Sequence, residues 1–224
     1  MLVREVMTSP VRTVTQDTPV RRAIRVLHEN DITAAPVVDA AGELVGVVSE
    51  MDLLRGEFEP DPRAFARPVR AETGPPPRRV ADVMTREVVT VTENTDAAVL
   101  VGLMVSKRIK SLPVLRGRRV VGIVSRRDLL RMLARSDDEL RAEVLARLAE
   151  QYPGETGWRV TVRDGVVELY GPAVRDRDRE RDRERDDARA EIAALLARTV
   201  PGVVRVRYAG RAADPAAPAD GPGG

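Results

Sequence analysis

Two short motifs carry the side chains of this sequence that could bind a phosphorylated sugar. Ser49 stands three residues before Asp52, and Ser125 stands three residues before Asp128. At a strand-to-helix junction, a hydroxyl, free backbone N–H groups and the helix dipole can together hold a phosphate. An aspartate one turn later lies on the same helix face, where its carboxylate can accept hydrogen bonds from both hydroxyls of a ribose. The motifs therefore suggest a site for a phosphorylated sugar.

The same Ser-x-x-Asp pattern is also typical of a helix capping box. In that motif the serine accepts the third N–H of the helix, and the acidic side chain accepts the N–H of the serine. A cap and a ligand site are compatible, so both interpretations stay open. The occurrence of two complete copies in the same context favours ligand binding in at least one of them.

Basic residues accompany only the second copy. They are Lys107, Arg108, Lys110, Arg126 and Arg127. The equivalent positions of the first copy hold Asn30, Asp31, Thr33, Glu50 and Met51. Because a phosphate needs cationic neighbours, Lys107, Arg108, Arg126 and Arg127 are phosphate-side candidates, with a solvated basic rim as the alternative for each. We expect the copies to differ in affinity or ligand, and the Ser125–Asp128 copy to be the one filled if only one is.

An internal repeat explains why the motif occurs twice. Residues 6–8 return as 83–85, a spacing of 77, and residues 45–55 return as 121–131, with eight of eleven positions identical. Each copy predicts a strand, a helix, two strands and a closing helix. Strands are expected at 11–14, 35–38 and 44–48, and again at 88–91, 112–115 and 120–124. Thr18 before Pro19 predicts the N-cap of the first helix, and the two motif serines predict caps of the closing helices.

The repeated unit, Gly-hydrophobic-x-Ser-x-x-Asp preceded by Pro-Val and a hydrophobic strand, resembles the CBS domain, and the two copies resemble the paired CBS module over about residues 1–134. The resemblance implies an adenosine nucleotide (AMP, ADP or ATP) as regulatory ligand, no required cofactor, and a homodimer formed through the CBS modules. It implies ribose contacts from Asp52 and Asp128 and phosphate contacts from Ser49 and Ser125. Further contacts are expected from Thr18 and Thr95, and from Val37 and Val114, which follow Pro36 and Pro113.

The pattern changes after residue 137. An apolar helix stripe at 140–148 precedes a hairpin centred on Asp164-Gly165, a second helix stripe at 191–199 and a strand at 203–207. Residues 162–171 together with 200–206 resemble the BON domain, over about 137–208. The resemblance implies an interaction module that binds phospholipid or a protein partner.

These observations predict an α+β protein: two CBS modules packed as a pseudo-twofold pair, then a small α+β sandwich. The predicted parts are a first module at 1–57, a proline-rich linker at 58–78, a second module at 79–135, a BON-like domain at 137–208 with a charged insertion at 175–187, and a disordered tail at 209–224.

Composition narrows the function further. There is no cysteine, and His28 is the single histidine, so neither a metal site nor a catalytic site is expected. Lys and Arg number 37 against 35 Asp and Glu, so the near-neutral net charge does not indicate a general nucleic-acid binder. No stretch is typical of a signal peptide or a membrane span, so a cytoplasmic protein is expected. Nucleic acid is not expected as a partner, because acids alternate with the arginines of the insertion. The alternative to a nucleotide sensor is a structural adaptor in which both motifs are only caps and the BON-like domain binds a protein or phospholipid surface.

Overall fold

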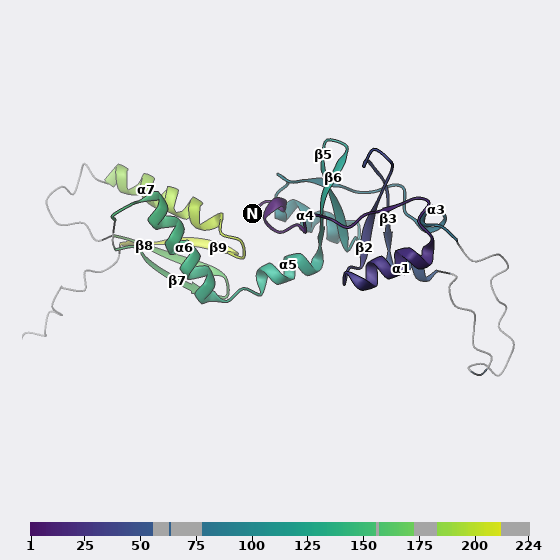
Figure 1. The fold of residues 1–224 in the computed structure, drawn as a ribbon. Helices are drawn as coiled ribbons and strands as arrows, with labels where there is room; N and C mark the ends of the chain where they lie inside the picture. Colours follow the sequence, from purple (N-terminus) through teal and green to yellow (C-terminus); the bar gives the residue numbers. More distant parts are fainter. Residues whose placement is uncertain (56–62, 64–77, 156, 173–182, 212–224) are drawn as a thin grey trace, which may run out of the picture. The chain divides into compact units, whose positions relative to one another are not determined.

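The computed structural model describes residues 1–55, 63, 78–155, 157–172 and 183–211 (Figure 1). The chain divides into two compact units, one of Leu2–Asp128 and the other from Leu129 onward. Most of the predicted linker, the insertion up to residue 182 and the tail from residue 212 lie outside the described residues.

The first unit contains both repeats. The first repeat forms β1 (Val14–Thr15), α1 (Val20–Glu29), β2 (Ala34–Val38), β3 (Leu44–Ser49) and α2 (Glu50–Leu54). The second forms β4 (Val91–Thr92), α4 (Ala97–Ser106), β5 (Ser111–Arg116), β6 (Arg119–Ser125) and α5 (Arg126–Leu133), which continues past the end of the unit. Each repeat has a three-stranded sheet in which the first two strands are parallel and the last two form an antiparallel hairpin. The predicted order of elements is confirmed in both copies.

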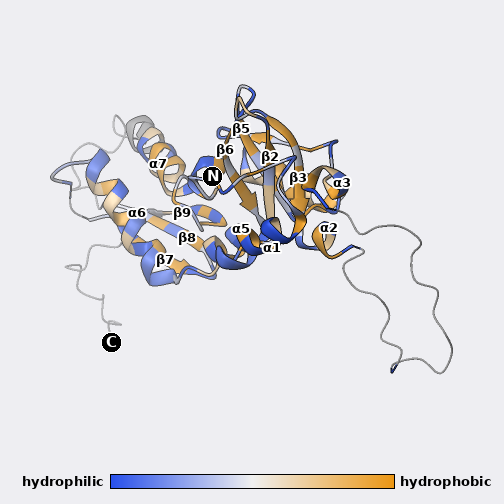
Figure 2. Ribbon diagram, turned by 45° about the vertical axis from the view of Figure 1, so that its right-hand side comes forward, coloured by the Kyte–Doolittle hydropathy of each residue, from blue (hydrophilic) through white to orange (hydrophobic). Residues whose placement is uncertain are grey.

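The strands of both sheets are largely buried because their side chains are apolar. Residues 34–37 of β2 are all buried, which a near-continuous apolar run favours. Val37 and Val114 occupy the same place in the two sheets, and both are completely buried. Figure 2 shows the hydrophobic strands of both sheets beside the more hydrophilic α1.

Two short helical turns that the sequence analysis missed connect the repeats. These are η1 (Val3–Glu5) and α3 (Val80–Val83), each at the start of a repeat. Each turn docks on the other repeat: the N–H of Val3 bonds the carbonyl of Thr95, and that of Val80 bonds the carbonyl of Thr18, both at 2.9 Å. Val80 is buried in the core of the first repeat. The repeats therefore exchange their leading segments.

The exchange continues into the strands through paired backbone hydrogen bonds. The N–H of Thr8 bonds the carbonyl of Ile123 at 2.8 Å, and the N–H of Thr85 bonds that of Val47 at 2.9 Å. At each of these two crossings, the leading segment of one repeat lies against the last strand of the other. Glycine is needed in that strand, because a Cβ at Gly122 would lie 2.7 Å from the sulfur of Met7. A Cβ at Gly46 would lie 2.8 Å from the sulfur of Met84. The repeated glycine thus makes room for the methionine of the other copy.

Two local predictions at the start of each repeat are wrong. The predicted strands at 11–14 and 88–91 shrink to β1 and β4, because the segments before them lie against the other repeat. Thr18 does not cap α1, whose N-cap is Pro19 and has no side-chain cap bond. The Thr18 hydroxyl instead accepts the N–H of Thr15 at 3.0 Å and closes the turn ahead of the helix.

The second unit is a sheet with two helices on one face (Figure 1). Its elements are α6 (Asp137–Gln151), β7 (Arg159–Arg163), β8 (Val166–Gly171), α7 (Arg183–Arg198) and β9 (Arg205–Arg211). The predicted hairpin turn is confirmed, since Asp164 and Gly165 have positive φ angles of 50° and 71°. The carboxylate of Asp137 accepts both backbone N–H groups of that turn at 2.9 Å, which ties the start of α6 to the hairpin.

The sheet order is β7-β8-β9, with β9 parallel to β8. The core contains apolar residues of both helices and of the sheet face beneath them, among them Leu140, Val144, Val167 and Leu169. Within the described residues, no helix combines the length and the apolar character needed to cross a bilayer.

Candidate functional site

Both Ser-x-x-Asp motifs form complete capping boxes. The Ser125 N–H and hydroxyl both donate to Oδ2 of Asp128, at 2.8 Å and 2.6 Å, and the Asp128 N–H returns to the serine oxygen at 3.4 Å. In the first repeat the corresponding distances between Ser49 and Asp52 are 2.9, 2.7 and 3.4 Å. The predicted caps are therefore confirmed, and in both copies one carboxylate oxygen is used by the cap.

The second oxygen of the aspartate distinguishes the copies. Asp128 is buried, with 6% of its surface exposed, whereas Asp52 is partly exposed. The hydroxyl of Thr8, on the segment exchanged from the first repeat, donates to Oδ1 of Asp128 at 3.5 Å. The sequence analysis assigned Thr8 no role, although its return as Thr85 was the available signal.

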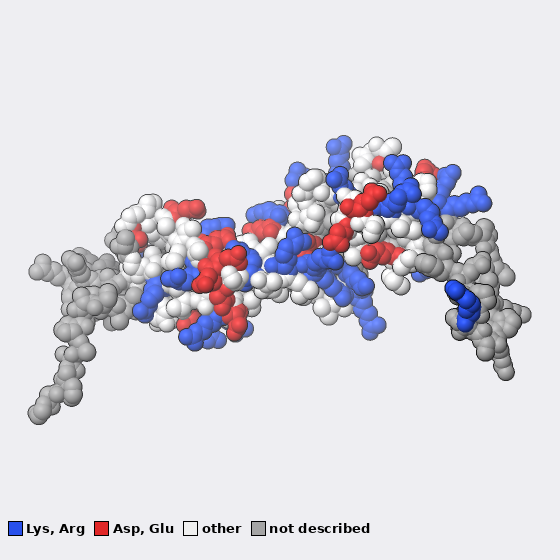
Figure 3. Space-filling view, turned by 60° about the horizontal axis from the view of Figure 1, so that its bottom comes forward, with Lys and Arg blue, Asp and Glu red and all other residues white. Residues whose placement is uncertain are grey.

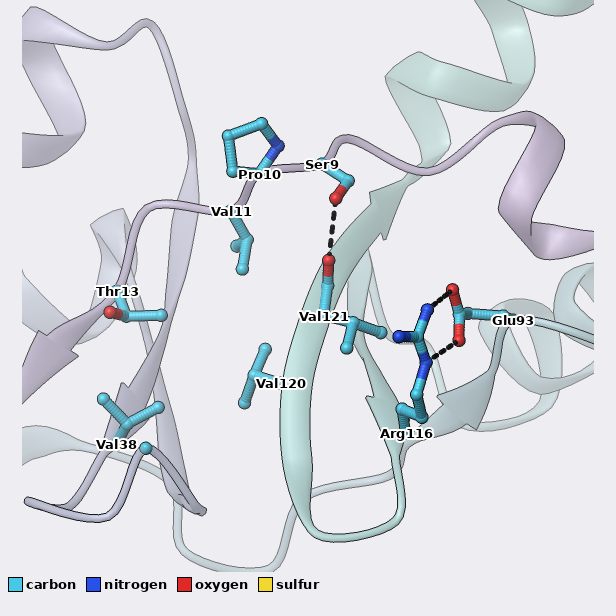
Figure 4. A pocket seen from close by; sticks show the side chains of 10 residues that line it. Ser9, Pro10, Val11, Thr13, Val38, Glu93, Arg116, Val120 and Val121 are labelled. Carbon is cyan, nitrogen blue, oxygen red and sulfur yellow. Dashed lines mark hydrogen bonds and ion pairs between the residues drawn. The ribbon is translucent and has the colours of Figure 1, made fainter.

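The residues that follow Thr8 in the chain line a cavity of about 440 Å³. Its lining residues are Ser9, Pro10, Val11, Thr13, Val38, Gly42, Glu93, Arg116, Val120 and Val121. They come from the exchanged segment, from the hairpin β5–β6, from the end of β2 and the turn that follows it, and from the residue after β4. In Figure 4 the side chains of Val11, Val38 and Val120 face the same space, so part of the wall is apolar. None of these lining residues was among the candidates predicted from the sequence.

Polar groups fix one wall of the cavity. The guanidinium of Arg116 donates two hydrogen bonds to the carboxylate of Glu93, at 2.8 and 2.7 Å, and the Ser9 hydroxyl donates to the carbonyl of Val121 at 2.9 Å (Figure 4). The hydrogen bonds from Arg116 hold the pKa of Glu93 below its ordinary value. They also raise the pKa of Arg116, so the pair stays ionised at neutral pH.

The cavity and the second motif lie at opposite ends of β6. Val121 lines the cavity and Ser125 ends the strand, so about 13 Å of extended chain separates them. Between them, Thr8 pairs with Ile123 and contacts Asp128. One continuous stretch thus carries an apolar pocket, a buried carboxylate and a capped helix start.

The repeat-related place in the other copy has different chemistry. The counterparts of Ser9 and Pro10, 77 residues later, are Arg86 and Glu87. Arg86 donates to the carbonyl of Ala81 at 2.8 Å. A small hydroxyl and a proline in one copy are therefore replaced by two long charged side chains in the other.

The four phosphate-side candidates cluster around the start of α5. Lys107 and Arg108 lie in the turn after α4, and the Arg126 side chain reaches back to that turn, bonding the carbonyl of Ile109 at 3.2 Å. Arg127 forms an exposed ion pair with Asp31 of the first repeat at 2.9 Å. Figure 3 shows Lys and Arg side chains gathered around α5.

The remaining predicted contacts lie elsewhere. Thr95, like Thr18, closes a turn: its hydroxyl accepts the N–H of Thr92 at 3.0 Å. Val37 and Val114 point into the cores of their sheets, whereas the cavity is lined by Val38, the next residue. The structure thus brings together the second motif and the bases but not the two threonines or the two valines.

Two models of known protein families match this chain. The model described as "CBS domain" matches residues 3–59 and 80–135, and the model described as "BON domain" matches residues 136–181. The chain belongs to the CBS domain family. It is a tandem CBS pair followed by a BON domain.

The similar proteins share the CBS part. The "Uncharacterized protein MJ1404" of Methanocaldococcus jannaschii is 30% identical over 135 residues, which cover 59% of this chain and 32% of that relative. The match thus spans about a third of the length of that relative. The crystal structure of an "uncharacterized conserved protein from Pyrococcus horikoshii" has a TM-score of 0.50 at 26% identity, over 60% of this chain and 93% of that one. The CBS domain pair of protein MJ0100, in complex with 5′-methylthioadenosine and S-adenosyl-L-methionine, has a TM-score of 0.49 at 26% identity, over 59% and 94%.

Proposed function

We propose that the CBS pair is a regulatory module that binds an adenosine nucleotide, AMP, ADP or ATP, at the site containing Ser125 and Asp128. The observation that carries the proposal is the contact of Thr8 with the buried Asp128 carboxylate, in a segment whose next residue, Ser9, lines a cavity of about 440 Å³. A flat, apolar base suits the valine-lined cavity, and ribose hydroxyls suit a carboxylate that already accepts hydroxyl bonds. No catalytic step is assigned to the site.

Charge supports the second copy over the first. Arg126 and Arg127 begin α5, where the positive end of the helix dipole adds to their attraction for a phosphate. The first copy has Glu50 and Met51 in the same positions, and the glutamate repels a phosphate. Binding at the second site would also engage the exchanged segment of the first repeat, so occupancy has a direct way to alter how the repeats hold each other.

Titration calorimetry with AMP, ADP and ATP tests this proposal, with GTP as the control for the base. Asp128→Asn should weaken adenosine nucleotide binding by about tenfold or more, because a bond to a charged group is lost. Asp52→Asn is the matched control, since it alters the same kind of cap but should leave the affinity within about twofold. Absence of heat with all three nucleotides, or equal losses in the two variants, would refute the assignment.

The adaptor hypothesis rests on a specific observation, namely that both serine hydroxyls are fully engaged in their caps. If the motifs are only caps, Asp52→Asn and Asp128→Asn lower the melting temperature alike and calorimetry finds no nucleotide. The experiment therefore separates the two functions.

We also propose that the CBS pair forms a homodimer through α4. The outer face of this helix is apolar, with Val99, Val101 and Val105 exposed to 57%, 44% and 72%. The equivalent α1 instead exposes Arg22 and Arg25, as a solvated helix does. Val105→Glu should therefore shift sedimentation velocity from dimer to monomer, whereas Arg25→Glu should not. A wild-type monomer at micromolar concentration would overturn the proposal.

A further inference from the structure

The uncovered side of the sheet in the BON unit has an unusual charge. Helices α6 and α7 cover the face that carries Val160, Val167 and Val206, so the alternating residues form the opposite face. This open face consists of Arg159, Thr161 and Arg163 of β7, Val166, Glu168 and Tyr170 of β8, and Arg205 and Arg207 of β9. It therefore carries four arginines against one carboxylate.

The arginines of the open face are available to a partner. Arg159, Arg163, Arg205 and Arg207 are all exposed, and within the described part of the chain none of them forms an ion pair. The guanidinium of Arg159 lies over the ring of Tyr170, 4.6 Å from its centre. Four uncompensated guanidinium groups on one side of a domain favour a polyanionic partner.

The four arginines of the open face form two rows that follow the strands. The two edge strands, β7 and β9, carry the arginines, while the central strand β8 carries Glu168 and Tyr170. Since neighbouring strands are about 4.8 Å apart, the two arginine rows are separated by about 10 Å. A ring and a hydrogen-bond acceptor therefore lie between two rows of positive charge.

This pattern fits a single-stranded nucleic acid better than a bilayer. The phosphates can follow a row of arginines while a nucleobase stacks on the ring of Tyr170 or on the guanidinium of Arg159. Glu168 can accept a hydrogen bond from an exocyclic amine of a nucleobase. A uniformly anionic bilayer would also bring lipid phosphates against the central carboxylate, which reduces its attraction to the two arginine rows. Among the eight residues given for this face, Val166 is the one aliphatic side chain, and it is half-buried, so these residues offer little to insert into lipid.

We propose that the open face of the BON unit binds single-stranded nucleic acid, with phosphates on Arg159, Arg163, Arg205 and Arg207 and a base at Tyr170. The arginines of this face are distinct from those of the charged insertion at 175–187, in which acids alternate with bases. The near-balance of 37 basic and 35 acidic residues describes the chain as a whole, whereas this face alone carries an excess of arginine. The surface adds a second binding activity to the chain, separate from the nucleotide site of the CBS pair.

Fluorescence anisotropy of the full chain with a fluorescein-labelled oligouridylate tests the proposal. With four phosphate contacts, the plot of log K against log salt concentration should have a slope of about −3. Arg205→Gln with Arg207→Gln should reduce the slope to about −1.4 and weaken binding by tenfold or more at low salt. Arg22→Gln with Arg25→Gln on α1 removes the same charge from an exposed helix and should change neither.

Tyr170 separates base stacking from simple charge attraction. Tyr170→Leu should weaken oligouridylate binding about tenfold, whereas Tyr170→Phe should keep it, because only the first loses the ring. Melting temperatures of both variants show whether the unit is folded. Binding to vesicles of phosphatidylcholine and phosphatidylglycerol without binding to oligouridylate, or equal losses in the open-face and α1 variants, would overturn the proposal.

Discussion

The two Ser-x-x-Asp motifs have nearly identical local geometry but different surroundings. Their cap distances differ by no more than 0.1 Å, yet Asp128 is buried against the hydroxyl of Thr8 while Asp52 is partly exposed. The capping box is determined by residues three apart in the sequence. The environment of the second carboxylate oxygen depends on a segment 120 residues away. A local motif can therefore be duplicated faithfully while its surroundings diverge.

The difference extends to the residues that follow Thr8 and Thr85 in the exchanged segments. After Thr8 the exchanged segment contributes Ser9 and Pro10 to the lining of the cavity, whereas the repeat-related segment carries Arg86 and Glu87. Duplication thus preserved the backbone framework, and substitutions in the exchanged segments made the two places chemically distinct. Two matched pairs of substitutions and two single substitutions test this comparison.

The largest expected effect comes from the glycines at the crossings. Gly122→Val and Gly46→Val should each lower the free energy of unfolding by about 1–3 kcal/mol, because the added atoms overlap the methionine of the other repeat. Urea unfolding measures this loss. Gly122→Val should also weaken nucleotide binding, since it displaces Thr8, whereas Gly46→Val should spare it. Unchanged unfolding free energies would contradict the exchanged packing.

Removal of the cap hydroxyls should affect stability equally and ligand affinity unequally. Ser49→Ala and Ser125→Ala should each cost about 1 kcal/mol of stability, the usual contribution of a helix N-cap. Calorimetry should show weaker nucleotide binding only for Ser125→Ala. Loss of binding in both variants would mean that the two copies share the ligand.

A smaller effect is expected where a carboxylate of the first repeat competes with the ligand phosphate for the side chain of Arg127. Asp31 pairs with Arg127, and both side chains are largely exposed, so Asp31→Asn should change the stability by less than about 0.5 kcal/mol. Asparagine also tolerates the positive φ angle of 49° at this position. With Arg127 released, the affinity for ATP should rise about two- to fivefold, more at low salt than at high salt. An unchanged affinity would exclude Arg127 from the phosphate end.

The smallest effect concerns the acid dependence of the cavity wall. Because the pKa of Glu93 is lower in the folded state, its pairing with Arg116 contributes stability above the ordinary glutamate pKa. That contribution is lost as the pH falls through the lowered value. Carbon-detected NMR titration should show the pKa of Glu93 rise toward its ordinary value in Arg116→Gln. No difference between the two proteins would mean that the pair is absent in solution.

Much of the fold follows from local patterns. The apolar runs of β2 and β5, the stripe of α1 and the Asp164-Gly165 turn all formed close to the predicted residues. These elements agree with the sequence because their periodicity and turn chemistry act over a few residues. The misassigned Thr18 shows the limit of such rules, since a hydroxyl next to a helix can close the preceding turn as well as cap the helix.

The candidate site was predicted only in part, because some of its residues are close neighbours in the sequence and others are far apart in it. Ser125, Asp128 and the bases near them were recognisable because they follow one another along the repeat or return in register. Thr8 was not, since its proximity to β6 comes from the exchange of segments between repeats. Glu93 and Arg116 were not either, since they come together through the pairing of β4 with β5 and of β5 with β6 within the second repeat.

The sequence alone therefore determined the repeat, its order of elements and the two capping boxes, because each depends on contacts between near neighbours in the chain. Only the tertiary structure decided which carboxylate is buried, where the cavity lies and which face of the BON sheet is left open with its four exposed arginines. Those properties depend on burial and on pairing between distant segments. No residue spacing along the chain encodes them directly.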